Sequence, residues 1–168
     1  MNRRTFLTYA STTAALALLS ACGFHLRGAN GEANLPFKTI KLNFPESSTL
    51  GAELQRNIRA NGTEVVTDSK LAEATLDVLS EARDKVVLSL NSQGRVREYT
   101  LFYKFRFRVL GSTGQELLAA TEIILKRDIS FNESQALAKE AEEGSLYRDM
   151  QGDLVQQILR RLVALKPA

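Results

Sequence analysis

The sequence predicts an α/β fold: a two-layer sandwich in which two helices pack on a mixed, mostly antiparallel sheet of about four to five strands. Residues 37–67 follow a strand, helix, strand order. Residues 71–129 contain three longer segments in which apolar and polar residues alternate. From Ser134 to the C-terminus the apolar period becomes helical. A sheet covered by helices on one face buries all of these apolar surfaces.

The first strand is predicted at 37–44, where apolar and polar residues alternate as in a half-buried strand. Apolar residues then recur every four positions from Leu50 to Ile58, a spacing typical of an amphipathic helix that ends at 61–62. A short β-branched strand is predicted at 63–67. This order predicts a right-handed crossover unit.

Three longer strands are predicted at 71–91, 96–110 and 116–129, with turns at 91–94 and 111–114. Short turns of this kind join neighbouring antiparallel strands, so the three strands are expected to form a meander.

Strict alternation assigns faces to these strands. In the first of them, one face is expected to carry Leu76, Val78, Ser80, Ala82, Val86, Leu88 and Leu90, and the other mainly Asp77, Glu81, Arg83 and Lys85. In the second, one face is expected to carry Tyr99, Leu101, Tyr103, Phe105, Phe107 and Val109, and the other Thr100, Lys104, Arg106 and Arg108.

The C-terminal segment is predicted to be an amphipathic helix, because an apolar stripe runs from Leu154 to Leu165. Gly144 and Gly152 are expected to interrupt it, since glycine is a poor helix former.

Residues 1–21 are typical of a secretory signal peptide, with Arg3 and Arg4 ahead of a short apolar run. The run Leu-Ser-Ala-Cys that ends at Cys22 resembles the lipobox of bacterial lipoproteins. That resemblance implies cleavage before Cys22 and acylation of this residue, and Gly23 beside it favours the outer membrane. The alternative is a signal peptide cut before an incidental free cysteine. The arginine pair also resembles a twin-arginine export signal, so the export route stays open.

The mature chain is expected to comprise a lipidated tether, 22–36, and one domain, 37–168. Removing 21 residues from 168 leaves 147, enough for a single core. Two of the 22 basic residues are removed with the signal, which leaves 20 against 19 acidic residues. This balance argues against general binding to nucleic acid. The single cysteine excludes an intramolecular disulfide.

No pattern of catalytic residues is visible. The only histidine, His25, lies in the tether and lacks a positioned nucleophile. The Cys and His content is too small for a zinc site, and no glycine-rich phosphate loop is present. Glu140, Glu142 and Glu143 are interpreted as a solvated helix start. We therefore expect a protein that is not an enzyme and needs no cofactor or metal.

Basic residues are the most conspicuous polar feature: Arg95, Arg97, Lys104, Arg106, Arg108, Lys126, Arg127 and Lys139. The simpler interpretation of the row at 104–108 is a solvated sheet face. The other is a site for an anionic ligand, because guanidinium groups suit phosphate. The aromatic residues Tyr99, Phe102 and Tyr103 would then meet its acyl or sugar portion.

The mature start Cys-Gly-Phe-His-Leu-Arg-Gly, residues 22–28, resembles that of the LptE family of lipopolysaccharide-assembly lipoproteins. Gly94-Arg95 before a tyrosine-rich strand, Leu137-Ala138-Lys139 and the leucine-rich C-terminal helix are similar to the family too. The resemblance implies an outer-membrane lipoprotein, bound to the membrane by its lipid, that plugs the β-barrel LptD and assists its assembly. It also implies lipopolysaccharide as the ligand.

By this resemblance, Arg95, Arg97 and Lys139 are expected to bind lipopolysaccharide phosphates, with Lys126 and Arg127 as weaker candidates. A plug in a polar lumen is expected to have a mixed-charge exterior without apolar patches. The rival interpretation is a lipoprotein pilot or structural adaptor for another outer-membrane channel, such as a secretin. A third interpretation, a small surface-tethered hydrolase, is disfavoured because the sequence offers no nucleophile–base pair.

Overall fold

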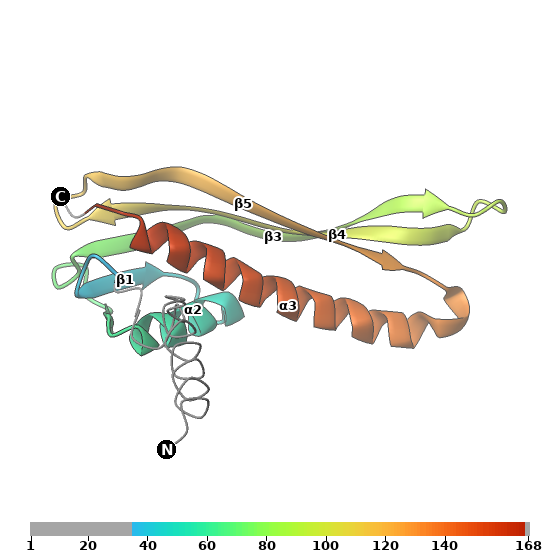
Figure 1. Cartoon of the computed structure of the whole chain (residues 1–168), viewed down its shortest axis with the longest axis horizontal. Coiled ribbons are helices and arrows are strands. Elements are labelled where there is room, and N and C mark those ends of the chain that lie inside the picture. Colours follow the sequence, from blue (N-terminus) through green and yellow to red (C-terminus); the bar gives the residue numbers. More distant parts are fainter. Residues whose placement is uncertain (1–34, 167–168) are drawn as a thin grey trace, which may run out of the picture. The chain divides into compact units, whose positions relative to one another are not determined.

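A computed structural model describes residues 35–166, and the predicted signal peptide, Cys22 and residues 22–34 of the predicted tether lie outside this range. The elements are β1 (Thr39–Asn43), α2 (Thr49–Ala60), β2 (Glu64–Val66), β3 (Ala74–Leu90), β4 (Val96–Gly111), β5 (Glu116–Ser130), the 3₁₀ helix η1 (Glu133–Gln135) and α3 (Ala136–Val163). The five strands form one sheet in the order β2-β1-β3-β4-β5 (Figure 1). The predicted α/β class, mixed sheet and two helices are confirmed.

A crossover from β1 through α2 to β2 is present, and β1 pairs in parallel with both β2 and β3. The Ser48 side chain caps α2 by accepting the Gly51 N–H at 3.0 Å. Leu50, Leu54 and Ile58 are fully buried on its inner face. These contacts fix α2 against the sheet.

The core lies between the sheet and the two helices. Its sheet side is a row of buried residues on β4, Leu101, Tyr103, Phe105, Phe107 and Val109. Its helix side includes Met150, Leu154, Ile158 and Leu162 of α3, all fully buried. Each such large apolar side chain stabilises the fold by about 1.5–3 kcal/mol relative to an exposed position. The predicted faces of β4 are confirmed.

The helix α3 is continuous over 28 residues, so the predicted interruptions at Gly144 and Gly152 are wrong. A glycine in a helix interior costs only about 1 kcal/mol. Burial of the apolar stripe on α3 exceeds that cost and keeps the helix whole.

The predicted faces of β3 are wrong from Ser80 to Val87, and a second register shift follows between Val87 and Ser89. Val78 pairs with Phe107 and Ser80 pairs with Arg106, so Leu79 is an extra residue in β3, a β-bulge. The bulge reverses the alternation of the strand, because an inserted residue shifts a period of two by one step. Glu81, Arg83 and Lys85 therefore lie opposite the inward residues of β4 and point to the helix side, and the small or polar Ser80 and Ala82 point to the other.

We call the part of the sheet beyond this bulge the arm: β3 from Ser80 to Leu90, with the parts of β4 and β5 paired to it. β1 pairs only with residues 74–77 of β3, so the arm has three strands (Figure 1). Both of its edge strands carry charged residues that point inward, Arg83 and Lys85 on β3 and Arg127 on β5. Inward charges and bulges of this kind discourage edge-to-edge pairing with other chains.

The expected absence of apolar patches is wrong for one stretch of the arm. Val86, Val87, Leu88 and Leu90 are 47–57% exposed. β4 pairs with this stretch along one edge, and neither β1 nor β2 pairs with it along the other. None of the helices within residues 35–166 combines the length and the apolar character needed to cross a membrane.

Candidate functional site

Three of the five basic residues predicted to bind ligand gather at the end of the arm. Arg95 closes the turn between β3 and β4, where its N–H donates to the Asn91 side chain at 2.9 Å. Its guanidinium lies 3.5 Å from the Glu133 carboxylate of η1. Both side chains are more than half exposed, so this ion pair contributes little stability and leaves Arg95 accessible.

Arg97 lies two residues further along β4. Its carbonyl accepts the Phe131 N–H at 2.7 Å, which continues the β4–β5 ladder past the end of β5. The side chain is exposed and forms no ion pair with any residue in the range 35–166. Arg97 is thus positioned by its backbone and has a free guanidinium.

Lys139 approaches the same region from the first turns of α3. Its Nζ donates to Ser130 Oγ at 2.9 Å and to Glu142 Oε2 at 2.8 Å. Its side chain is 17% exposed, whereas that of Glu142 is 50% exposed. The lysine is held in place, and its carboxylate partner can move away into solvent.

Two cavities open between these residues. One, of about 250 Å³, is lined by Asn91, Arg95, Val96, Arg97, Phe131, Asn132 and Glu133. The other, of about 340 Å³, is lined by Lys85, Tyr99, Ile129, Ser130, Phe131, Ala136, Lys139, Glu140 and Glu143. Phe131 borders both, and its ring packs edge-on against Tyr99 at a centroid distance of 5.4 Å. We call the larger one the lysine cavity.

The sequence prediction missed Lys85, which lies in the wall of the lysine cavity. Its Nζ lies 2.6 Å from the Glu143 carboxylate and 4.4 Å from the centroid of the Tyr99 ring. Strict alternation assigned Lys85 to the opposite side of the sheet, and the bulge at Leu79 brings it to the helix side. Lys85 directly follows Arg83 and Asp84 in the sequence, so nothing in the charge pattern set it apart from its neighbours.

The two weaker candidates lie on opposite faces of β5. Lys126 is paired across the strand with Phe102, on the face without helices. Arg127 points to the helix side and forms an ion pair with Asp153 of α3 at 2.6 Å. The structure therefore does not bring Lys126 and Arg127 together.

The basic row of β4 lies on the helix-free face and is largely paired there. Lys104 lies 2.9 Å from Asp84, and Arg108 lies 3.1 Å from Asp77. This pattern agrees with a solvated, charge-balanced face. Of the three aromatic residues considered for ligand contact, Tyr103 is fully buried in the core, whereas Tyr99 lines the lysine cavity.

The buried Tyr103 hydroxyl is the centre of a polar network at the base of the arm. It donates to Glu81 at 2.6 Å and accepts from Arg83 at 3.1 Å. Burial, reinforced by the Glu81 carboxylate, raises the pKa of Tyr103 to about 12. Burial also raises the pKa of the nearby Tyr147. Both phenols are therefore neutral at physiological pH and act as hydrogen-bonding groups.

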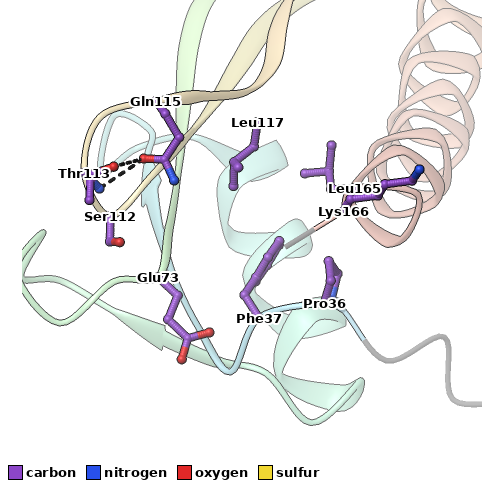
Figure 2. Close-up of a pocket in the computed structure, with 9 residues that line it drawn as sticks. All are labelled: Pro36, Phe37, Glu73, Ser112, Thr113, Gln115, Leu117, Leu165 and Lys166. Carbon is purple, nitrogen blue, oxygen red and sulfur yellow. Dashed lines mark hydrogen bonds between the residues drawn. The ribbon is translucent and has the colours of Figure 1, made fainter. Parts of the chain in front are cut away.

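A further cavity of about 470 Å³ lies by the turn between β4 and β5 (Figure 2). The turn residues Ser112, Thr113 and Gln115 border it, together with Phe37 and Leu165, and the Thr113 hydroxyl donates to the Gln115 side chain. None of the five predicted ligand residues lines it. Residues 35–166 contain no cluster of three or more potential metal ligands among His, Cys, Asp and Glu.

Comparison with known proteins links this arrangement to a family. The family model described as LptE, lipopolysaccharide-assembly, matches residues 37–162. The chain is 25% identical over 153 residues to the LPS-assembly lipoprotein LptE of Pectobacterium atrosepticum, covering 90% of this chain and 82% of that protein. It is 26% identical over 158 residues to the protein of the same name from Yersinia pestis, covering 92% of this chain and 74% of that one.

Solved structures of lipoproteins are also similar to this chain. An uncharacterized lipoprotein B from Nitrosomonas europaea is 41% identical, with a TM-score of 0.73, over 84% of this chain and 91% of that chain. The rare lipoprotein B from Shewanella oneidensis is 25% identical, with a TM-score of 0.67, over 75% of this chain and 94% of that chain. The sheet and its helices are thus shared with these lipoproteins.

Proposed function

Because this chain belongs to the LptE family of lipopolysaccharide-assembly proteins, we propose that it is an outer-membrane lipoprotein that plugs the LptD β-barrel. In this proposal it also assists assembly of the barrel and binds lipopolysaccharide during transport to the outer leaflet. It performs no catalysis and requires no cofactor.

The observation that carries lipopolysaccharide binding is the convergence of Arg95, Arg97 and Lys139 at the end of the arm. The three cations come from the β4 turn, from β4 itself and from α3, and they border two neighbouring cavities. Phosphates on the ligand would accept from these donors, because charge-assisted hydrogen bonds to phosphate are among the stronger polar contacts. Lys126 and Arg127 contribute less, since they point away from each other.

The helix-free face of the sheet supports the plug role. Its charges are balanced by Lys104–Asp84 and Arg108–Asp77 pairs, which suits contact with a polar barrel lumen. The exposed apolar stretch at Val86–Leu90 adds a surface that a partner could cover.

The test of ligand binding is the double substitution Arg95→Glu and Lys139→Glu in the full chain. We expect lipopolysaccharide affinity to fall by about tenfold or more, because two attractive charges become repulsive. The matched control is Arg56→Glu with Lys70→Glu, an equal change of net charge at exposed positions outside the arm. Equal binding by both variants would refute the proposed site.

The test of the barrel partner is co-purification after detergent extraction. A stoichiometric complex with LptD supports the plug. Recovery of a secretin, or of no channel, would refute it and favour a pilot or adaptor role.

Membrane attachment through Cys22 is tested by Cys22→Ala in cells depleted of the barrel. We expect the variant in the soluble fraction, because a mature chain without acyl groups loses its anchor. Full membrane retention would contradict the anchor.

A further inference from the structure

We infer that Lys85 is an additional phosphate-binding residue and that Glu143 competes with the ligand for it. This inference rests on the proposed lipopolysaccharide-binding function. It assigns to the lysine cavity a phosphate group of the ligand, held between Lys85 of β3 and Lys139 of α3.

The geometry of the lysine cavity suits a phosphate group. Lys85 and Lys139 line it from opposite elements, the sheet and the helix. Its volume of about 340 Å³ exceeds what one phosphate group with an attached sugar needs. Tyr99 and Phe131 are the aromatic residues of its lining, and the Lys85 ammonium lies 4.4 Å from the centroid of the Tyr99 ring. The cavity thus offers two cations and an aromatic surface to the same ligand.

Each lysine of the cavity is paired with a carboxylate of α3. Lys85 is paired with Glu143 at 2.6 Å, and Lys139 with Glu142 at 2.8 Å. Both carboxylates come from the same turn of α3. The side chains of Lys85 and Glu143 are 37% and 23% exposed, and those of Lys139 and Glu142 are 17% and 50% exposed. Ion pairs that water reaches are weak, so a doubly charged phosphate can replace a single carboxylate. Ligand binding is therefore an exchange of anions on two cations that are already positioned.

Acidic residues in the wall of the lysine cavity determine which anions can bind there. Glu140 and Glu143 also line the cavity, so its formal charge with two lysines is balanced. A weakly charged or singly charged ligand gains little from replacing the carboxylates of Glu143 and Glu142 on the two lysines. A phosphate monoester gains more, because it carries a charge of about −1.5 to −2 at neutral pH. The acidic residues thereby set a threshold that excludes singly charged anions.

The two members of the pair are expected to have opposite effects on binding. Lys85→Gln should weaken lipopolysaccharide binding by about fivefold, because one charge-assisted contact is lost. Glu143→Gln should strengthen it by about two- to threefold, because the competing carboxylate is gone. A merely structural ion pair predicts no such opposition, since both substitutions would remove the same bond.

The helix-free face provides a matched control. Lys104 and Asp84 form an ion pair of 2.9 Å with side chains 42% and 45% exposed, compared with 37% for Lys85 and 23% for Glu143. Lys104→Gln and Asp84→Asn should leave affinity unchanged. Thermal unfolding of all four variants verifies that each is folded.

The experiment measures binding of purified lipopolysaccharide to the full chain, and of the same material after its phosphate groups are removed. The expected result is opposite shifts for Lys85→Gln and Glu143→Gln with the phosphorylated ligand, and neither shift with the dephosphorylated one. In the double variant, Glu143→Gln should have no further effect, because the cation it competes for is absent.

Two failures are distinguishable. If Arg95→Glu with Lys139→Glu reduces binding while Lys85→Gln and Glu143→Gln behave like the control pair, the role of Lys85 is refuted and the proposed function stands. If the Arg95 and Lys139 double variant binds like the unchanged chain, the proposed site itself fails.

Discussion

The guanidinium of Arg83 lies over the Tyr103 ring, with Cζ 4.6 Å from the ring centroid, and donates to the Tyr103 hydroxyl at 3.1 Å. It also donates to Gln151 of α3 at 3.1 Å. Gln151 in turn donates to Glu53 of α2 at 2.6 Å. One side chain of the arm is therefore connected to both helices, and this network is where the arm is attached to the core.

Loss of the Tyr103 hydroxyl is expected to destabilise the domain. Tyr103→Phe keeps the ring in the core but leaves Glu81 and Arg83 without a shared partner, so we expect the free energy of unfolding to fall by about 1–2 kcal/mol. Urea denaturation measures the change. Tyr99→Phe is the control, because its ring lies at the cavity wall and not in the core. A Tyr103→Phe variant as stable as the unchanged chain would contradict the role of the network.

The raised pKa of Tyr103 predicts a loss of stability at high pH. The phenol has a pKa near 10 when unfolded and about 12 when folded, so the folded state holds its proton more tightly. This contribution is complete below pH 10 and is lost as pH rises toward 12, by up to about 3 kcal/mol. Urea denaturation across this window should show a steeper decline for the unchanged chain than for Tyr103→Phe. Parallel curves would show that other groups cause the decline.

Two glycines in helices are expected to respond oppositely to alanine. At Gly51 a Cβ would lie 2.8 Å from the Phe44 side chain, whose ring stacks on Phe105. Gly51→Ala should therefore destabilise by about 1–3 kcal/mol despite the better helix propensity. At Gly144 the nearest atom is the flexible end of Arg148, 3.6 Å away, so Gly144→Ala should stabilise by up to about 1 kcal/mol. Thermal unfolding of the Gly51→Ala and Gly144→Ala variants measures both changes. Destabilisation of both variants would refute the opposite responses that the steric surroundings predict.

The exposed stretch on β3 is expected to promote self-association when no partner covers it. Leu88→Thr with Leu90→Thr should lower binding of a hydrophobic dye and reduce aggregation, while the unfolding temperature changes little because both side chains are more than half exposed. Light scattering with dye fluorescence measures both effects. Leu76→Thr, at a fully buried position, is the contrasting control and should unfold far more easily. Unchanged aggregation would show that this stretch is not the adhesive surface.

The elements that could be predicted from sequence are those in which one period holds from end to end. The stripe of α2 and the alternation of β4 each continue without a break, and their buried faces were assigned correctly. The end of α2 at Asn61–Gly62 was also predicted from the sequence. In the structure Gly62 has a positive φ of 81°, a conformation that glycine adopts readily. Local chemistry decides these features.

The arm could be predicted only in part, because a bulge has no clear sequence signature. Leu79 looks like an ordinary strand residue, and its extra place in the ladder depends on the partner strand. For the same reason Lys85 was assigned to the wrong face and omitted from the site. Arg95, Arg97 and Lys139 were selected by resemblance and by charge. Alternation along the predicted strand already places the consecutive Lys126 and Arg127 on opposite faces, but only the structure shows that neither joins the other three.

The bulge at Leu79 also affects how relatives of this chain should be aligned. A gap placed at this residue would exchange the two faces of β3 as far as the next register shift, between Val87 and Ser89, and superimpose inward charges on solvated positions. An insertion of two residues beyond it would instead lengthen the arm and preserve every orientation. Length variation among homologues in this strand is therefore best interpreted by parity, odd or even, before any substitution there is given meaning.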